Sequence, residues 1–260
     1  MPGLKTVILL LMVAVLLVMP RSLWADTTFL SGKIGEFPIS VSLERNEEKL
    51  SGWYFYHSKA KEIRLDGSLD RQGAFRLEET AGDKKTGIFE GSVKEGRWTG
   101  TWRKTTGAAP LAFYLEENRN RLKNLKDNYN CTAKERDAKY HYTYIRKLKL
   151  AVADGVVKEF EAVQGAYGDD QDEQTCSIDL KDLKQVTSDV GILLQAKDDN
   201  AGNENKKCAI RIVGDPDILW IRFGDSSEEG NDCRGVDSVM FCSPRDIILD
   251  RRTRKCQVLK

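Results

Sequence analysis

Apolar and polar residues alternate in short stretches over residues 27–116. In the clearest stretch, FPISVSLE, every second residue is apolar: Phe37, Ile39, Val41 and Leu43. Serine and glutamate occupy the positions between the last three of these residues and directly after them. A period of two is that of a strand with one face in the core and the other toward solvent. The pattern therefore predicts a half-buried strand over residues 37–44.

Similar stretches recur at roughly ten-residue spacing, which is typical of an all-β domain. We predict further strands at residues 27–33, 49–56, 62–69, 73–79, 86–93, 96–103 and 110–116. The breaks between them, such as LDRQG and AGDKKTG, are rich in turn-forming residues. Consecutive strands joined by short turns usually pair, so these strands predict an antiparallel meander. About eight such strands close into an up-and-down barrel, whose interior is filled by side chains or holds one small ligand.

This region resembles calycin-type barrels, the architecture of lipocalins and avidins, in the number and spacing of its strands and in the GTW at residues 100–102. A lipocalin carries a GxW motif near its first strand, whereas the first strand here reads TTFLSGK. The resemblance therefore implies an architecture, and no ligand-binding residues are carried over from it.

Trp98 and Trp102 lie four positions apart in EGRWTGTW, with Gly100 midway. Alternation places these three residues on one face of the strand and Thr99 and Thr101 on the other. The glycine lets a neighbouring strand or side chain approach closely. We expect both tryptophans to fill the barrel interior, because aromatic side chains dominate cores. The alternative is a platform for a sugar or an apolar ligand at the barrel mouth.

Residues 117–130 contain few apolar side chains, and we interpret them as a polar, helical linker. The predicted barrel domain thus spans residues 26–116, and a second domain spans residues 131–260.

The second domain mixes two periodicities. Residues 138–152 alternate like a long strand, and residues 208–225 form an expected hairpin around a Gly-Asp-Pro-Asp turn. Val156, Phe160 and Val163 instead have helical spacing, which predicts a helix over residues 155–164. The predicted fold class is mainly β: an eight-stranded antiparallel meander barrel followed by a disulfide-stapled α+β domain.

The N-terminus has the order of regions found in a secretory signal peptide. Lys5 precedes an apolar run from Val7 to Met19, and the segment SLWA ends at Ala25. The run is shorter than the roughly 20 residues that a membrane span needs. We expect residues 1–25 to be removed on export, which leaves a secreted or periplasmic protein without a stable membrane anchor.

All six cysteines follow residue 130: Cys131, Cys176, Cys208, Cys233, Cys242 and Cys256. An even number in an exported chain predicts three disulfides, although six cysteines allow 15 pairings. No CxxC occurs and neither histidine is spaced from a cysteine like a zinc ligand, so we predict no metal site.

The loop of residues 231–246 is the most distinctive part of the second domain. A bond between Cys233 and Cys242 would close a short loop that presents Arg234, Asp237 and Met240 to a partner. The alternative is that both cysteines pair elsewhere and the loop is only a connection.

Positive and negative residues are interspersed and give a formal net charge of +1, so we expect no nucleic-acid partner. The acidic loops at 168–174 and 197–205 lack the spacing of a calcium-binding loop. His57 is expected at a strand end and His141 within a strand, and no nucleophile motif accompanies either. We therefore predict no catalytic residues and no cofactor.

Three functions follow from these observations, in order of preference. The first is a non-enzymatic exported protein that recognises a protein or glycan, such as an inhibitor of an extracellular enzyme. The second is a carrier that holds a small apolar or sugar ligand in the barrel, and the third is an enzyme of an unrecognised type. A hollow barrel would favour the carrier, whereas a filled one favours partner binding.

Overall fold

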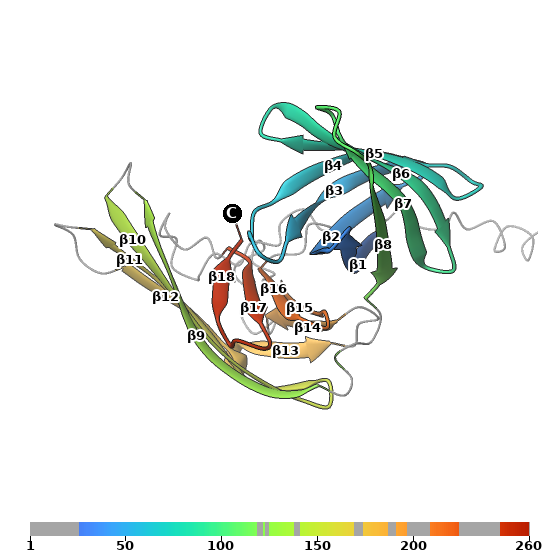
Figure 1. Ribbon diagram of the computed structural model, residues 1–260. Helices are drawn as coiled ribbons and strands as arrows, with labels where there is room; N and C mark the ends of the chain where they lie inside the picture. The colour runs from blue at the N-terminus through green and yellow to red at the C-terminus, as the bar shows by residue number, and fades with distance from the viewer. Residues whose placement is uncertain are drawn as a thin grey trace, which may run out of the picture.

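A computed structural model describes residues 26–118, 122, 125–137, 141–168, 174–186, 191–196, 209–223 and 245–259. These residues form three antiparallel β-sheets, one of which is a closed barrel (Figure 1). The only helix among them is a 3-10 turn, Leu180–Asp182. The prediction of a mainly β fold is therefore confirmed.

The barrel contains eight strands in sequence order, and β1 pairs with β8 to close it. Its strands are β1 (Asp26–Ile34), β2 (Phe37–Asn46), β3 (Lys49–Tyr56), β4 (Ile63–Leu69), β5 (Ala74–Ala81), β6 (Lys84–Lys94), β7 (Arg97–Lys104) and β8 (Leu111–Glu117). The predicted strands agree with these bounds to within a few residues at each end. Alternation and turn residues were sufficient to predict these strands because every pairing except the β1–β8 closure joins strands that are consecutive in the sequence.

Apolar side chains from every strand fill the barrel. Because successive side chains point to opposite faces, the alternating apolar residues meet inside. The buried interior residues are Leu30, Ile34, Ile39, Val41, Leu43, Leu50, Tyr54, Leu65, Leu69, Phe75, Leu77, Phe89, Trp98, Phe113 and Leu115. The barrel therefore has a hydrophobic core of its own.

The rest of the described chain forms two sheets. A four-stranded sheet contains β9 (Lys126–Asp137), β10 (Tyr142–Ala153), β11 (Val156–Gly168) and β12 (Gln174–Asp179). A six-stranded sheet contains β13 (Leu183–Val186), β14 (Ile192–Ala196), β15 (Ala209–Gly214), β16 (Ile218–Phe223), β17 (Ile247–Asp250) and β18 (Cys256–Val258). The predicted hairpin is the β15–β16 pair.

The predicted helix over residues 155–164 is wrong, because this segment lies in β11. The register between β10 and β11 shifts at Ala151 and Val152, so Lys158 is an extra residue in the ladder. The helix was predicted from the spacing of Val156, Phe160 and Val163, but Val156 is 42% exposed, whereas Phe160 is buried. A bulge shifts the alternation by one residue, so Val157 rather than Val156 lies on the buried face with Phe160.

The predicted helical linker is also wrong at its C-terminal end, because β9 begins at Lys126. Leu122 and Leu125, within the segment interpreted as a polar linker, are buried in the core between the two sheets. Two leucines in a polar background give too little periodicity for this burial to be predicted.

The six-stranded sheet is the middle of three layers, between the barrel and the curved four-stranded sheet (Figure 1). One of its faces carries Ile212, Leu219 and Ile221 into the core shared with the four-stranded sheet. Its other face packs Trp220 and Ile248 against the outside of the barrel. The nearly continuous apolar run ILWIRF of β16 fits a strand that is covered on both faces.

We call the contact between the barrel and this sheet the seam. Trp220 is 1% exposed, and its ring centroid lies 4.7 Å from that of Trp53 and 5.3 Å from that of Phe55. The guanidinium of Arg222 lies over the rings of Trp53 and Trp220. Asp246 accepts a hydrogen bond from Trp220 Nε1 at 2.9 Å and forms an ion pair with Arg222 at 3.5 Å. The seam thus combines aromatic packing with a paired buried charge.

A disulfide joins Cys131 of β9 to Cys256 of β18, with a Cα–Cα distance of 5.9 Å. It links the four-stranded sheet to the six-stranded sheet across 125 residues of sequence. Cys208, Cys233 and Cys242, and the side chain of Cys176, lie outside the described residues. The predicted disulfide stapling is therefore confirmed for one bond, and the other two stay predictions.

Candidate functional site

Trp98 belongs to the barrel core. Its side chain is 5% exposed, and its ring centroid lies 4.8 Å from that of Phe75. Across the pair of β6 and β7, a Cβ on Gly100 would come within 2.0 Å of the Glu90 carbonyl oxygen. Gly100 therefore allows β6 and β7 to approach closely, as predicted from its position between the two tryptophans.

Trp102 is half-buried at the other end of β7, where its indole contacts a buried carboxylate. Trp102 Nε1 donates to Glu79 Oε2 at 2.7 Å, and the Tyr54 hydroxyl donates to the same oxygen at 2.7 Å. Thr86 Oγ1 donates to Glu79 Oε1. We call these four residues the Glu79 cluster. Gly87 is part of its packing, since a Cβ there would lie 2.6 Å from Trp102 Nε1.

The Glu79 cluster places a carboxylate inside the barrel with three neutral donors. Glu79 is 5% exposed, whereas Glu78 points outward and pairs with Lys85. Burial and the charge of Glu79 raise the pKa of Tyr54 far above its ordinary value. Both carboxylate oxygens of Glu79 have donors, so the cluster is a satisfied polar network that positions Trp102.

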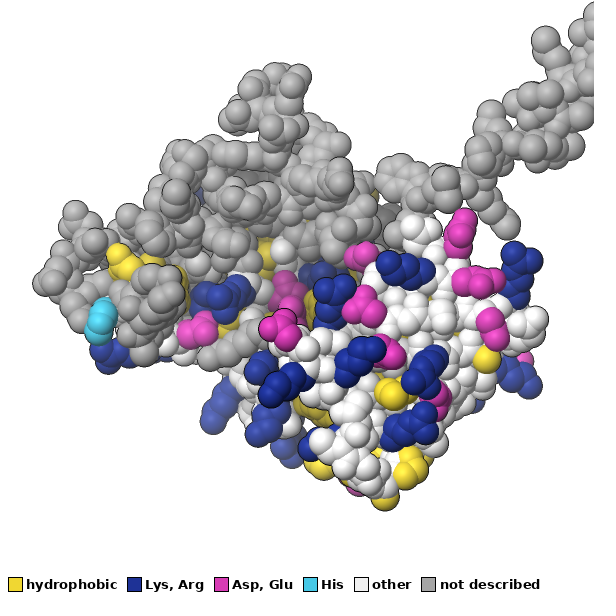
Figure 2. Space-filling model, turned by 90° about the horizontal axis from the view of Figure 1, so that it is seen from above, with side chains coloured by type: hydrophobic (Ala, Val, Ile, Leu, Met, Phe, Trp, Pro, Cys, Tyr) yellow, Lys and Arg dark blue, Asp and Glu magenta, His cyan; other side chains and the backbone are white. Residues whose placement is uncertain are grey.

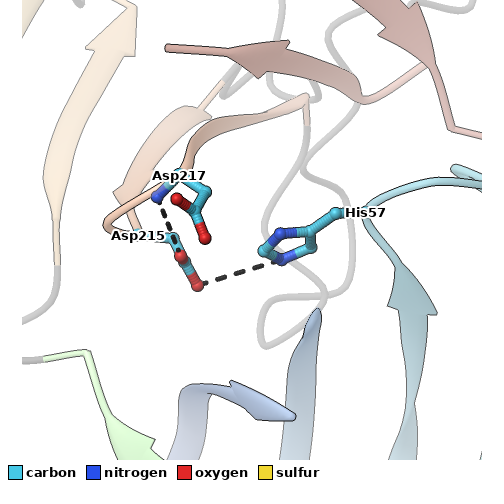
Figure 3. A group of neighbouring side chains, drawn as sticks. All are labelled: His57, Asp215 and Asp217. Atoms are coloured by element: carbon cyan, nitrogen blue, oxygen red, sulfur yellow. Dashed lines mark hydrogen bonds and ion pairs between the residues drawn. The ribbon is translucent and has the colours of Figure 1, made fainter. Parts of the chain in front are cut away.

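His57 follows β3, as predicted for a strand end, and reaches the β15–β16 turn at the edge of the seam (Figure 3). His57 Nε2 lies 3.0 Å from Ser40 Oγ and 3.9 Å from Asp215 Oδ2. Ser40 Oγ also lies 3.4 Å from Asp215 Oδ2. Asp217, on the same turn, is exposed.

Serine, histidine and aspartate meet here, but they do not form a catalytic triad. A triad needs the serine and the aspartate on opposite ring nitrogens, whereas Ser40 and Asp215 both face Nε2. Among the described residues His57 Nδ1 has no hydrogen-bond partner. Ser40 is 2% exposed, so its hydroxyl is out of reach of a substrate.

The β15–β16 turn is held by hydrogen bonds from both sides. Asp215 Oδ1 accepts from the backbone N–H of Asp217 at 3.2 Å, and Arg251 Nη1 donates to the Asp215 carbonyl oxygen at 3.0 Å. Burial lowers the pKa of His57, while the charges of Asp215, Asp217 and Asp250 act in the opposite direction.

Two exposed aromatic residues lie close to the β1–β2 turn. Tyr114 is on the outer face of the barrel, whereas Phe37 is at the barrel mouth, on the same face as Ile39, with its ring centroid 6.2 Å from that of Tyr56. Phe37 is 57% exposed and Tyr114 is 45% exposed. Lys33 pairs with Tyr114 of β8 on one side and with Pro38 of β2 on the other, and its ammonium lies 5.9 Å from the Tyr114 ring centroid. We call Lys33, Phe37, Pro38 and Tyr114 the rim patch.

Several predicted site residues are not brought together. Arg234, Asp237 and Met240 lie outside the described residues, as do most of the acidic loop at 168–174 and all of that at 197–205. His141 was predicted within a strand but occupies the turn before β10, with a φ of 58°. Arg254, between β17 and β18, pairs with Asp127 and lies over the Tyr129 ring.

Sequence reasoning missed Ser40, Glu79, Asp215 and Asp217. Asp215 and Asp217 were recognised only as turn residues, and nothing in the sequence connects that turn with His57. Glu79 carries a usable signal, because alternation puts it on the same face as Leu77 in β5. A carboxylate on a core-facing position indicates a polar network.

No protein-family model, curated protein or solved structure matches the chain. The closed eight-stranded antiparallel barrel is consistent with the calycin-type architecture that the sequence suggested. Within the described part of the chain, no helix has the length and apolar character needed to cross a membrane.

Proposed function

We propose that the chain is an exported, non-enzymatic protein that binds a macromolecular partner, a protein or a glycan, through the rim patch. The observation that carries the proposal is the barrel interior, which is occupied by the protein's own side chains. Each strand contributes at least one buried apolar residue to that interior. Recognition is then left to the outer surface.

The packing inside the barrel argues against a carrier. Trp98 contacts Phe75, and the ring centroids of Phe89 and Phe113 lie 5.2 Å apart. At the other end, Trp102 directs its N–H to Glu79 rather than offering it to a ligand. A carrier instead presents apolar walls and a few free polar groups to its ligand.

The rim patch has the chemistry of a recognition surface. Tyrosine and phenylalanine provide large contact area at a small cost in conformational entropy, and aromatic anchors dominate binding energies. The patch lies on paired strands of the barrel, which fix its geometry before binding. On the face of the molecule shown in Figure 2, Lys and Arg side chains are interspersed with Asp and Glu side chains. This mixture favours a protein or glycan partner over a polyanion.

Export is part of the proposal. The N-terminal segment has the features of a signal peptide, and the bond between Cys131 and Cys256 is of the kind that persists in oxidising compartments. We infer that the mature protein begins near Asp26 and is secreted or periplasmic.

Site-specific photo-crosslinking tests the proposal. The photoreactive residue p-benzoylphenylalanine replaces Phe37 or Tyr114 in two variants and Val156 in a control, because Val156 is 42% exposed but lies on the four-stranded sheet. Each variant is exported from its native cells and irradiated there. We expect one discrete adduct from positions 37 and 114 and none from position 156. Equal labelling at all three positions, or a small molecule retained by the unmodified protein, would contradict the proposal.

A further inference from the structure

One group of side chains at the seam has the composition of a metal site and is not used by the proposed function. It contains an imidazole and two carboxylates, from His57, Asp215 and Asp217. One ligand atom from each side chain lies within 4.8 Å of the other two. Figure 3 shows His57 facing the turn that carries both aspartates.

The distances are close to those that a single ion requires. Zinc bonds to imidazole nitrogen and carboxylate oxygen are roughly 2.0–2.2 Å long, so two ligand atoms of a tetrahedral ion are about 3.3–3.6 Å apart. His57 Nε2 and Asp215 Oδ2 are 3.9 Å apart, which is too far for a direct hydrogen bond and only a few tenths of an ångström, roughly, from the tetrahedral separation. Asp217 is exposed and can rotate to complete the set.

The β15–β16 turn holds Asp215 in place. Asp215 Oδ1 accepts from the backbone N–H of Asp217, and a bond of this kind to the oxygen that does not face the ion orients a carboxylate ligand. Arg251 donates to backbone carbonyl oxygens of the turn and not to the carboxylates. Ser40 Oγ contacts His57 Nε2 and Asp215 Oδ2, the atoms that would face the ion, so the ion would replace these two contacts.

We propose that His57, Asp215 and Asp217 bind a divalent first-row transition metal ion, with Zn²⁺ as the representative, at the seam. An imidazole with carboxylates suits Zn²⁺, Co²⁺ or Mn²⁺, whereas Ca²⁺ and Mg²⁺ prefer oxygen ligands alone. Three protein ligands leave a position for water. The ion would link the end of β3 to the β15–β16 turn, and so tie the barrel to the six-stranded sheet.

This site is independent of the rim patch, so the two proposals fail separately. The first measurement is calorimetric titration of the EDTA-treated, disulfide-intact protein with Zn²⁺, and with Ca²⁺ and Mg²⁺ for comparison. We expect one Zn²⁺ per chain and no comparable binding of Ca²⁺ or Mg²⁺. Zn²⁺ should also raise the thermal midpoint, because it binds only the folded arrangement.

Two variants locate the ion. Asp217→Asn changes an exposed side chain and should leave the fold intact, while weakening Zn²⁺ by at least the ~10–100-fold that loss of an outer-shell partner costs. Asp83→Asn, at an exposed turn of the barrel, is the matched control and should bind like the parent. A Co²⁺ spectrum without thiolate charge-transfer bands would exclude binding by cysteines. Unchanged affinity in Asp217→Asn, or thiolate bands with Co²⁺, would overturn the assignment.

Discussion

Replacement of Trp220 by alanine is the most informative perturbation of the seam. The side chain is 1% exposed and its ring contacts Phe29, Phe55 and Trp53 of the barrel. Deleting a buried tryptophan costs about 3–5 kcal/mol, because contacts are lost and a cavity remains.

Two further consequences place Trp220→Ala toward the upper end of that range. Asp246 loses the donor Trp220 Nε1, although it keeps the Phe223 N–H and the ion pair with Arg222. Arg222 also loses one of the rings over which its guanidinium lies. The loss of a hydrogen bond to the buried carboxylate of Asp246 adds to the free energy lost with the packing of the Trp220 ring.

Denaturant unfolding followed by circular dichroism measures the effect. For the parent we expect one transition, because the seam couples the barrel to the six-stranded sheet. Trp220→Ala should lose about 3–5 kcal/mol or separate the transition into two steps. Val156→Ala is the control: it shortens a side chain that is 42% exposed on the four-stranded sheet and should change stability by less than about 0.5 kcal/mol.

If the unfolding midpoint and slope of Trp220→Ala equal those of the parent, packing at the seam does not couple the barrel to the six-stranded sheet. The same conclusion follows if the parent already unfolds in two independent steps. Either result would mean that the layers fold as separate domains.

The remaining predictions concern the barrel, the pH response and the thiols. Trp98→Ala should destabilise the protein by about 3–5 kcal/mol in the same assay, whereas Trp102→Phe should cost about 1–3 kcal/mol because Glu79 loses one donor. Burial and Asp127 raise the pKa of Tyr129 from 10.0 to about 12, so its contribution to stability is complete below pH 10 and is lost as the pH rises through about 12. Tyr129→Phe should therefore show a shallower loss of stability in that interval, and an identical slope would contradict the burial of this hydroxyl. Intact mass with and without alkylation should give a mature chain that begins at or near Asp26 and carries no reactive thiol; alkylation of the native protein would contradict three disulfides.

The barrel could be predicted from the sequence because its information is local. Each strand alternates with a period of two, and each turn contains residues that favour reversal of the chain. The second region was predicted less well, since the bulge at Lys158 shifts the alternation of β11 and puts Val156 and Phe160, which have helical spacing in the sequence, on opposite faces of the strand. Leu122 and Leu125 gave no periodic signal.

Among the candidate site residues, too, those placed by local alternation could be predicted, and those brought together by tertiary packing could not. The position of Trp98 in the core follows from alternation, and the structure confirms it. His57 meets Asp215 only because the outer face of β3 packs on the six-stranded sheet, and no local pattern encodes that packing. The contacts at the seam therefore depend on tertiary packing and could not be predicted from the sequence.

The occupied barrel interior is the central claim, and fluorine NMR of the protein labelled with 5-fluorotryptophan tests it most directly. The predicted mature chain contains four tryptophans, Trp53, Trp98, Trp102 and Trp220, and single Trp→Phe variants assign their resonances. The change of chemical shift between H₂O and D₂O reports contact with solvent. We predict no such change for Trp98, which is 5% exposed, and a measurable one for the half-buried Trp102. A solvent-sensitive Trp98 resonance, or one that moves when small apolar ligands or sugars are added, would contradict the packed core and favour a carrier.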